Sequence, residues 1–257
     1  VYYGAVLAWG VQYTIYSVNA AWGDDPTTFF TDTFLQVVPG DTFSWAPAWA
    51  VMIPLALVWI LVLFVIGRGL SKGVEAANKI FLPLLVILFL ALVIRALFLP
   101  GAVEGLNAFF TPNWAALADP KVWLAAFAQI FYSLSVGFGI MLTYASYLQR
   151  KSNLTGTALV AGFANSSFEI LAGIGVFSAV GFMAHQGGVS VSEVEGLTGT
   201  ILSFVTFPKI ISMMPGGPIF GVLFFSSLVL AGVTSLLSLL QVVSGGLQDK
   251  FGWSPAR

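Results

Sequence analysis

The stretch Gln129-Ile-Phe-Tyr-Ser-Leu-Ser-Val-Gly-Phe-Gly139 lies in an apolar segment, Val122 to Leu148, that is long enough to cross a bilayer. Two serines and two glycines interrupt this segment at the depth of the hydrocarbon. Non-helical backbone is tolerated there only where it lines a polar cavity or is buried in protein. The sequence therefore predicts a broken helix whose free backbone groups bind an ion or a substrate near the midplane.

The composition indicates that most of the chain lies in a membrane. Of the 257 residues, 58% are hydrophobic and only 8% are charged, whereas about 25% of a soluble domain is charged. Several apolar segments reach the ~20 residues that a membrane helix needs. We expect an all-α integral membrane protein. Residues 1–257 should form one transmembrane domain, with an outer lid loop at residues 185–218. The six expected spans are Val1 to Trp22, Ala48 to Gly67, Ile80 to Leu99, Val122 to Leu148, Gly156 to Ala184 and Ile219 to Val243.

The basic residues predict the orientation of these spans. If the loops alternate between the two sides, seven basic residues fall on one side and three on the other, and the richer side is expected to be cytoplasmic. The first span then runs from inside to outside. The expected inner residues are Arg68, Lys72, Lys79, Arg150, Lys151, Lys250 and Arg257, and the outer ones are Arg95, Lys121 and Lys209.

Several classes of site are disfavoured by the residue types. The chain has no cysteine and a single histidine, His185, so disulfides and thiolate metal sites are excluded and a histidine metal site is disfavoured. Nothing in the sequence suggests nucleic acid as a partner. Val1 opens inside an apolar segment with no signal-peptide pattern before it, and we expect an internal piece of a longer protein.

Two connections could move. The expected lid loop contains two periodic pieces, Val191 to Phe204 and Pro208 to Met214, which predict a helical hairpin. Pro83 follows Gly73 with nine residues between them, so the inner end of that helix could unwind and open an exit path. A simple proline kink is the alternative, and spacing alone favours the kink.

Two polar clusters at membrane depth favour a site over simple helix packing. Three polar residues surround the break: Gln129, Ser133 and Ser135. Hydrogen bonds between packed helices contribute only ~0.6 kcal/mol each, and helix packing does not explain the glycines beside these residues. Asn165 and Glu169 lie four residues apart, on one helix face. A carboxylate in mid-membrane costs ~2.5 to 3.5 kcal/mol. The alternative is a neutral Glu169 that holds two helices together.

A third cluster, Thr234, Ser235 and Ser238, has a plainer interpretation when it is taken alone. Hydroxyl groups at helical positions usually donate to carbonyls of their own helix. The alternative is a Na⁺ site, since this hard cation prefers oxygen ligands, and the Ala231 carbonyl would add one more. Asp249, beside Lys250, is expected at a solvated helix end, although it could close a gate with a basic partner.

With these residues in view, the chain resembles a neurotransmitter:sodium symporter of the bacterial amino-acid type. The resemblance covers essentially the whole chain and rests on Gln129 to Gly139, Thr143-Tyr-Ala-Ser-Tyr147 and Ala231-Gly-Val-Thr-Ser235. It implies an inverted-repeat transporter fold with a discontinuous sixth helix, of which the chain would supply the third to eighth helices of twelve.

The resemblance also implies a largely apolar substrate pocket, suited to a hydrophobic amino acid. Tyr3 matches a third-helix tyrosine that caps the substrate, while Phe138 sits over the site. The full implied substrate set is Tyr3, Tyr132, Ser133, Ser135, Phe138, Ser235 and Leu239.

Two sodium sites are implied, each only half present in this chain. Ser133 and Asn165 match ligands of the site that shares the substrate carboxylate, and Ala231, Thr234 and Ser235 match the eighth-helix half of the other. At the position of Glu169, chloride-dependent relatives keep a serine, so a carboxylate there implies that chloride is dispensable and that proton countertransport is possible. The residues at this chloride-site equivalent are Gln129, Ser133, Asn165 and Glu169.

Four further residues resemble gating elements. Tyr147 and Asp249 match parts of the inner gate, and Gly73 with Pro83 match a helix-unwinding motif, which favours the exit-path interpretation. We therefore expect sodium-coupled symport of a hydrophobic neutral amino acid. The expected location is the inner (plasma) membrane, where the chain contacts the lipid bilayer. A non-transporting sensor on the same fold is an alternative, and a membrane enzyme using Glu169 is a weaker one, because no histidine or cysteine partner lies at that depth. The oligomeric state is not indicated.

Overall fold

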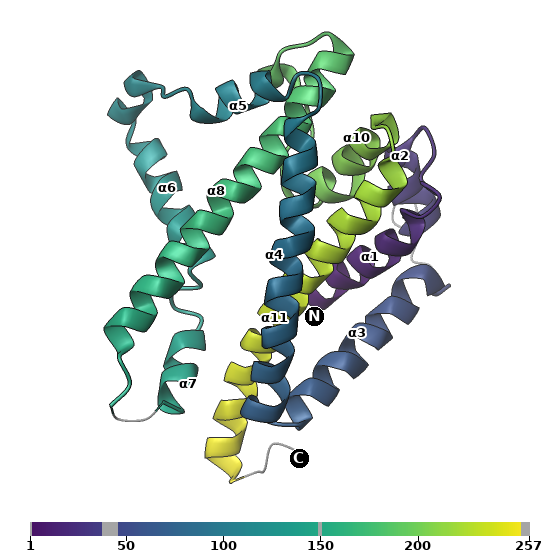
Figure 1. The fold of residues 1–257 in the computed structure, drawn as a ribbon. Helices are drawn as coiled ribbons and strands as arrows, with labels where there is room; N and C mark the ends of the chain where they lie inside the picture. The colour runs from purple at the N-terminus through teal and green to yellow at the C-terminus, as the bar shows by residue number, and fades with distance from the viewer. Residues whose placement is uncertain (1, 38–45, 149–150, 253–257) are drawn as a thin grey trace.

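The computed structural model describes residues 2–37, 46–148 and 151–252, and this part of the chain is helical and contains no strand (Figure 1). The regular elements, in order, are α1 (Tyr2–Tyr16), α2 (Pro26–Thr28), η1 (Phe29–Phe34), α3 (Trp49–Gly67), η2 (Leu70–Glu75), α4 (Ala76–Leu97), α5 (Ala102–Phe110), η3 (Trp114–Ala118), α6 (Pro120–Ser133), α7 (Ile140–Ser146), α8 (Leu154–Gly187), η4 (Val191–Glu193), α9 (Gly199–Ile201), η5 (Leu202–Thr206), α10 (Phe207–Met213) and α11 (Gly217–Phe251). The expected all-α fold is therefore confirmed.

Four helical stretches are long and apolar enough to cross a membrane, namely Trp49–Gly67, Lys72–Leu97, Leu154–Gly187 and Gly217–Phe251. The last two have 34 and 35 residues and extend beyond the expected spans at both ends. The expected first span is helical as α1, which ends at Tyr16, before the expected end at Trp22. The expected span from 122 to 148 is divided between α6 and α7.

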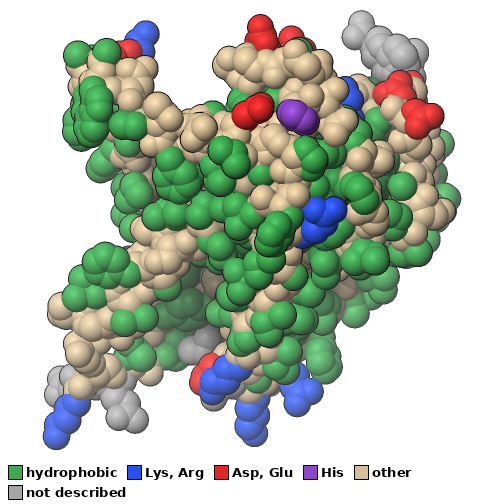
Figure 2. All heavy atoms as spheres, turned by 45° about the horizontal axis from the view of Figure 1, so that its top comes forward, with side chains coloured by type: hydrophobic (Ala, Val, Ile, Leu, Met, Phe, Trp, Pro, Cys, Tyr) green, Lys and Arg blue, Asp and Glu red, His purple; other side chains and the backbone are tan. Residues whose placement is uncertain are grey.

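The ends of the long helices carry the charge asymmetry that the sequence predicts. The α3–α4 connection, the start of α8 and the end of α11 lie at the same end of the molecule (Figure 1). Most basic side chains visible in Figure 2 gather at that end, and acidic side chains with the histidine gather at the other. Arg150 and Arg257, two of the expected inner residues, lie outside the described residues.

Glycines let the helices around α8 approach one another closely. A Cβ atom on Gly105 of α5 would lie 1.8 Å from the Phe177 carbonyl oxygen of α8, and one on Gly181 would lie 2.4 Å from the Gly101 carbonyl oxygen. Real Cβ atoms do not approach backbone so closely, so only glycine fits. Phe109 then stacks on Phe177 with ring centroids 4.8 Å apart, which fixes α5 across the outer end of α8.

An aromatic cluster packs the outer ends of α1 and α11. The Tyr13 ring is fully buried and lies 5.1 Å from both the Phe204 and the Phe225 rings, between centroids, and 5.3 Å from the Phe34 ring. We call this cluster the outer aromatic core; its members, all at most 8% exposed, are Tyr13, Trp22, Phe30, Phe34, Phe204 and Phe225. It ties the connection after α1 and the segment before α11 to the helices themselves.

The segment between α8 and α11 differs from the predicted hairpin. After the short turn η4, helix runs without interruption from Gly199 to Met213 through α9, η5 and α10. Pro208 was expected to begin a second helix, but it lies inside this continuous helical stretch, directly after the π-helical turn η5. The hairpin prediction is wrong, and we call residues 199–213 the lid helix.

Candidate functional site

The chain breaks its helix where the serines and glycines predict. α6 ends at Ser133 and α7 begins at Ile140. Between them, Ser135 has φ +52°, Gly137 has φ +85° and Gly139 has φ +79°. Left-handed backbone ends a helix, and it is strained for any residue but glycine, so Ser135 holds an uncommon conformation. The broken helix is confirmed.

Asn165 of α8 reaches the break with its side-chain amide. Its Nδ2 donates to Ser133 Oγ at 3.2 Å and to Glu169 Oε1 at 3.0 Å. An amide nitrogen carries two hydrogens, so both donors are used and the amide oxygen remains as an acceptor. The three side chains are partly buried. This arrangement presents oxygen atoms at the end of α6.

Glu169 and Gln129 are placed differently. Among the described residues, Glu169 is hydrogen-bonded along its own helix through Asn165, and the bond between helices is made by Asn165 and Ser133. The alternative in which Glu169 itself joins two helices is thus not what the contacts show. Gln129 is exposed on α6, and its side chain makes no hydrogen bond within the part of the chain that the structure describes.

The hydroxyl groups of α11 bond to their own helix, as the plainer interpretation predicts. Thr234 Oγ1 donates to the Ala231 carbonyl oxygen at 2.8 Å, and Ser238 Oγ donates to the Thr234 carbonyl oxygen at 3.1 Å. A hydroxyl that donates keeps its lone pairs, and a carbonyl has a second lone pair. The Thr234 hydroxyl oxygen can therefore still bind a cation. The Ala231 carbonyl oxygen lies inside the continuous helix α11, where it accepts from the helical backbone as well as from the Thr234 hydroxyl, and it would exchange one of these bonds for the ion.

Three of the expected substrate residues meet across α1, α6 and α11. Tyr3 of α1 lies close to both Ser235 of α11 and Tyr132 of α6. The Tyr132 and Phe138 rings meet edge to face, 6.4 Å apart between centroids. Tyr132 is nevertheless 68% exposed and Phe138 46% exposed, whereas Leu239 is partly buried on α11.

The residues expected at the inner gate are separated. Tyr147 ends α7 and is half exposed. Asp249 is exposed near the end of α11 and has no basic partner among the described residues. Gly73 is buried in η2, where a Cβ would lie 2.0 Å from the Val65 carbonyl oxygen. Pro83 is exposed inside the continuous helix α4, so that helix is not unwound here.

A cavity of about 880 Å³ lies beside this inner end, between the start of α4 and the end of α7. We call it the inner pocket; it is lined by Val74, Glu75, Asn78, Lys79, Leu82, Pro83, Tyr144, Tyr147 and Leu148. It brings Pro83 and Tyr147 to one space, as an exit path would require. Tyr144, which also donates to Ser238 Oγ at 2.9 Å, was not singled out from the sequence, because a tyrosine in an apolar segment gives no separate signal.

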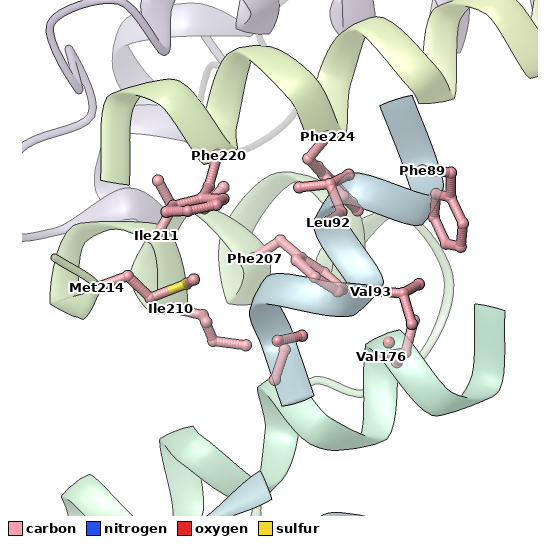
Figure 3. A pocket seen from close by; sticks show the side chains of 13 residues that line it. Phe89, Leu92, Val93, Val176, Phe207, Ile210, Ile211, Met214, Phe220 and Phe224 are labelled. Carbon is pink, nitrogen blue, oxygen red and sulfur yellow. The ribbon is translucent and has the colours of Figure 1, made fainter. Parts of the chain in front are cut away.

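A second cavity is a poor candidate for a polar ligand. It is small, about 50 Å³, and lies between α4, α8, α10 and α11, where Phe207, Phe220 and Phe224 point into it with aliphatic neighbours (Figure 3). Binding sites usually add a few convergent polar groups to an apolar wall, and this lining has none. We interpret it as a packing gap beneath the lid helix.

The comparisons with known proteins agree with the geometry. Residues 23–256 match the sodium:neurotransmitter symporter family. An uncharacterized sodium-dependent transporter of Methanocaldococcus jannaschii is 39% identical over 254 residues, which are 98% of this chain and 51% of that protein. The sodium- and chloride-dependent creatine transporter 1 of Homo sapiens is 33% identical over 86% of this chain and 34% of its own length.

A solved structure has the same fold. The crystal structure of MhsT in complex with L-phenylalanine is 35% identical and superposes with a TM-score of 0.77, over 99% of this chain and 54% of that one. The chain thus spans about half the length of the archaeal relative and of MhsT, and about a third of the human transporter. The family is one of sodium-coupled membrane transporters and not of enzymes, and this chain, with its broken helix α6–α7, belongs to the sodium:neurotransmitter symporter family.

Proposed function

We propose that the protein containing this chain carries a hydrophobic neutral amino acid into the cell together with Na⁺, by alternating access and without need of chloride. The observation that carries the proposal is the polar bridge at the break, where Asn165 donates to both Ser133 and Glu169. This bridge uses both amide hydrogens of Asn165 and leaves its amide oxygen as an acceptor, and oxygen ligands suit a hard cation.

Two sodium positions are proposed, each with half of its ligands in this chain. Ser133 and Asn165 would serve the first, next to the substrate carboxylate. Ala231, Thr234 and Ser235 would serve the second, and the 2.8 Å between Thr234 Oγ1 and the Ala231 carbonyl oxygen sets two acceptors side by side.

The proposed substrate follows from the side chains around the break. The proposed walls have three aromatic rings, from Tyr3, Tyr132 and Phe138, and the aliphatic side chain of Leu239. Ser135 and Ser235 add hydroxyl groups beside them. L-Phenylalanine is bound in the related MhsT structure, and a substrate of this kind suits such walls. The relative from Homo sapiens is named for creatine, so family membership alone does not select the substrate.

Glu169 is the residue on which the proposed chloride independence depends. A carboxylate hydrogen-bonded to Asn165 supplies beside the first sodium position the negative charge that a bound anion would otherwise supply. In energetic terms, each Na⁺ that moves down a potential of ~100 mV gives ~2.3 kcal/mol. Two ions would give ~4.6 kcal/mol, which is about three powers of ten in substrate concentration ratio.

The test is uptake of labelled L-phenylalanine by the full-length protein in liposomes, with an inward gradient of either Na⁺ or K⁺ and with chloride replaced by gluconate. Sodium-driven uptake in gluconate is the expected result. Uptake that needs chloride would contradict the role of Glu169 but not symport. Sodium-dependent binding without uptake would indicate a sensor, and no response to any hydrophobic amino acid would contradict the substrate class.

A further inference from the structure

A row of hydroxyl and carbonyl groups joins α7 to the proposed second sodium position. Tyr144 of α7 donates its hydroxyl hydrogen to Ser238 Oγ of α11 at 2.9 Å. Ser238 Oγ donates to the Thr234 carbonyl oxygen at 3.1 Å, and Thr234 Oγ1 donates to the Ala231 carbonyl oxygen at 2.8 Å. The row therefore begins on α7 and ends on two of the proposed ion ligands, Thr234 and Ala231.

Tyr144 makes the side-chain hydrogen bond that connects these two helices. The other hydroxyl bond of α7, from Ser146 Oγ to the Thr143 carbonyl oxygen at 2.7 Å, stays within α7. Elsewhere α7 meets α11 by packing alone, at Gly245, where a Cβ would lie 3.4 Å from Thr143 Cγ2. The Tyr144 hydroxyl thus adds one directional contact to this packing, and a hydrogen bond holds only within a narrow range of distance and angle.

The same tyrosine is also a wall of the inner pocket. Tyr144 lines it opposite Leu82 and Pro83 of α4. Tyr144 therefore lies between the inner pocket and the row of hydroxyl groups. It lines the pocket, and its hydroxyl group donates to Ser238 Oγ. If α7 moves away from α11, the hydrogen bond breaks and the wall of the pocket moves with it.

We propose that Tyr144 is a positioning residue whose hydrogen bond to Ser238 couples sodium binding at Ala231 and Thr234 to closure of the inner pocket. The inference rests on the proposed function, since it takes the α11 oxygens as ion ligands. An ion bound there holds the Thr234 side chain and its turn of helix in place. The carbonyl oxygen of the same residue accepts from Ser238 Oγ, so the ion also helps to fix the hydroxyl to which Tyr144 donates. Such coupling is reciprocal, so loss of the Tyr144 bond must weaken sodium binding.

The experiment uses the full-length protein with Leu82→Cys as a reporter in the inner pocket, where this side chain is 48% exposed. The 257 residues contain no cysteine of their own; any cysteine elsewhere in the protein is first replaced. The rate of labelling by a water-soluble thiol reagent is measured as sodium is raised, and the sodium concentration that gives half of the protection is compared with that of Tyr144→Phe. Substrate affinity at saturating sodium is measured in parallel.

Tyr144→Phe should raise this sodium midpoint between about twofold and tenfold, which is what the net loss of one hydrogen bond gives, and leave substrate affinity at saturating sodium unchanged. Ser238→Ala should raise the sodium midpoint by the same factor. The double variant of Tyr144→Phe and Ser238→Ala should raise it no further than either single variant. Ser146→Ala is the matched control, since its hydroxyl bonds only within α7, and should have the original midpoint.

Two results would overturn the inference. In the first, the sodium concentration that half-protects Leu82→Cys from labelling is the same in Tyr144→Phe as in the control Ser146→Ala. The hydrogen bond would then not couple sodium binding to closure of the inner pocket, and the proposed symport would be unaffected. If sodium does not change the labelling of Leu82→Cys even without a further substitution, both the inference and the second sodium position are wrong.

Discussion

The outer aromatic core and the α6–α7 break represent two different ways of holding a membrane protein together. Tyr13 and Phe225 are fully buried among other rings, whereas the described residues of α6 and α7 include no buried side chain. The first region is fixed by packing over a large apolar area. The second is attached to its neighbours by a few polar contacts, from Asn165 to Ser133 and from Tyr144 to Ser238. Stability and binding should therefore respond to substitution in different places.

The largest expected effect breaks the packed region. Phe225→Ala removes a ring that lies 5.1 Å from Tyr13 and 5.9 Å from Phe204 between centroids. We expect it to lower the free energy of unfolding by about 3–5 kcal/mol, as large-to-small changes in cores do. The measurement is reversible unfolding of the full-length protein in mixed micelles.

The matched control for this prediction is Phe127→Ala on α6, where the ring is 66% exposed. We expect a change within about 0.5 kcal/mol, as at other unburied positions. A loss at Phe127 as large as that at Phe225 would contradict the comparison, because it would mean that α6 is as tightly packed as α11 in the whole protein.

The next effect belongs to the polar bridge and should appear in binding instead of stability. Asn165→Ala removes two hydrogen bonds and one proposed ion ligand, and contacts to charged groups are worth about 1.5–3 kcal/mol. The sodium concentration for half-maximal amino-acid binding should rise about tenfold or more. Asn153→Ala is the control on the same helix, since Asn153 Oδ1 accepts from the Gly156 amide at 2.9 Å and caps α8 away from the break. An equal sodium midpoint for both variants would show that Asn165 is not a ligand of the ion.

A subtler prediction concerns the charge at the break. Glu169→Ser removes the proposed fixed negative charge, so uptake by this variant should fall several-fold in gluconate and recover in chloride. Glu104→Ser, at an outer carboxylate near His185, should behave as the unaltered protein in both media. Uptake by Glu169→Ser that ignores chloride would show that the carboxylate does not replace an anion.

The smallest expected effect lies at the edge of the packed region, in the connection after α1. The Thr28 hydroxyl donates to Asp25 Oδ2 at 2.6 Å, and the Thr27 and Thr28 amides donate to Oδ1. These bonds, that of the Thr28 hydroxyl above all, hold the pKa of the Asp25 carboxyl below its usual value. A depressed pKa contributes stability above the unfolded-state value of about 4 and loses it as the pH falls through the folded-state pKa.

Hydrogen exchange at the Thr27 and Thr28 amides measures this local effect. Protection should be constant near neutral pH and decline as the medium becomes more acidic than pH ~4, after correction for intrinsic exchange rates. Asp25→Asn, which cannot titrate, should abolish the decline. A decline of the same size in Asp25→Asn would assign it to another group.

Much of the broken helix could be predicted from the sequence, because glycine and serine in an apolar segment act locally. Gly137 and Gly139 take left-handed backbone that other residues avoid, and this depends on no distant partner. The polar bridge was predicted only in part, since the four-residue spacing places Asn165 and Glu169 together but says nothing of Ser133, which lies 32 residues away from Asn165.

The failures come from contacts that join distant segments. The lid helix continues through Pro208 because Phe204 is buried in the outer aromatic core and Phe207 stacks on Phe224 with centroids 4.2 Å apart, and no local pattern reveals this. α1 ends early because Ser17 begins a series of turns that place Trp22 against Tyr13, stacked at 5.9 Å. Hydropathy registers both segments as apolar and cannot separate a spanning helix from a buried turn.

The most direct test of the central claim, that the break is a sodium-linked binding site, is equilibrium binding of labelled L-phenylalanine to the full-length protein in lipid nanodiscs. Sodium is replaced stepwise by potassium at constant ionic strength in chloride-free buffer. We expect saturable binding in sodium that disappears in potassium and is weakened by Asn165→Ala. Binding of equal strength in sodium and in potassium would contradict it.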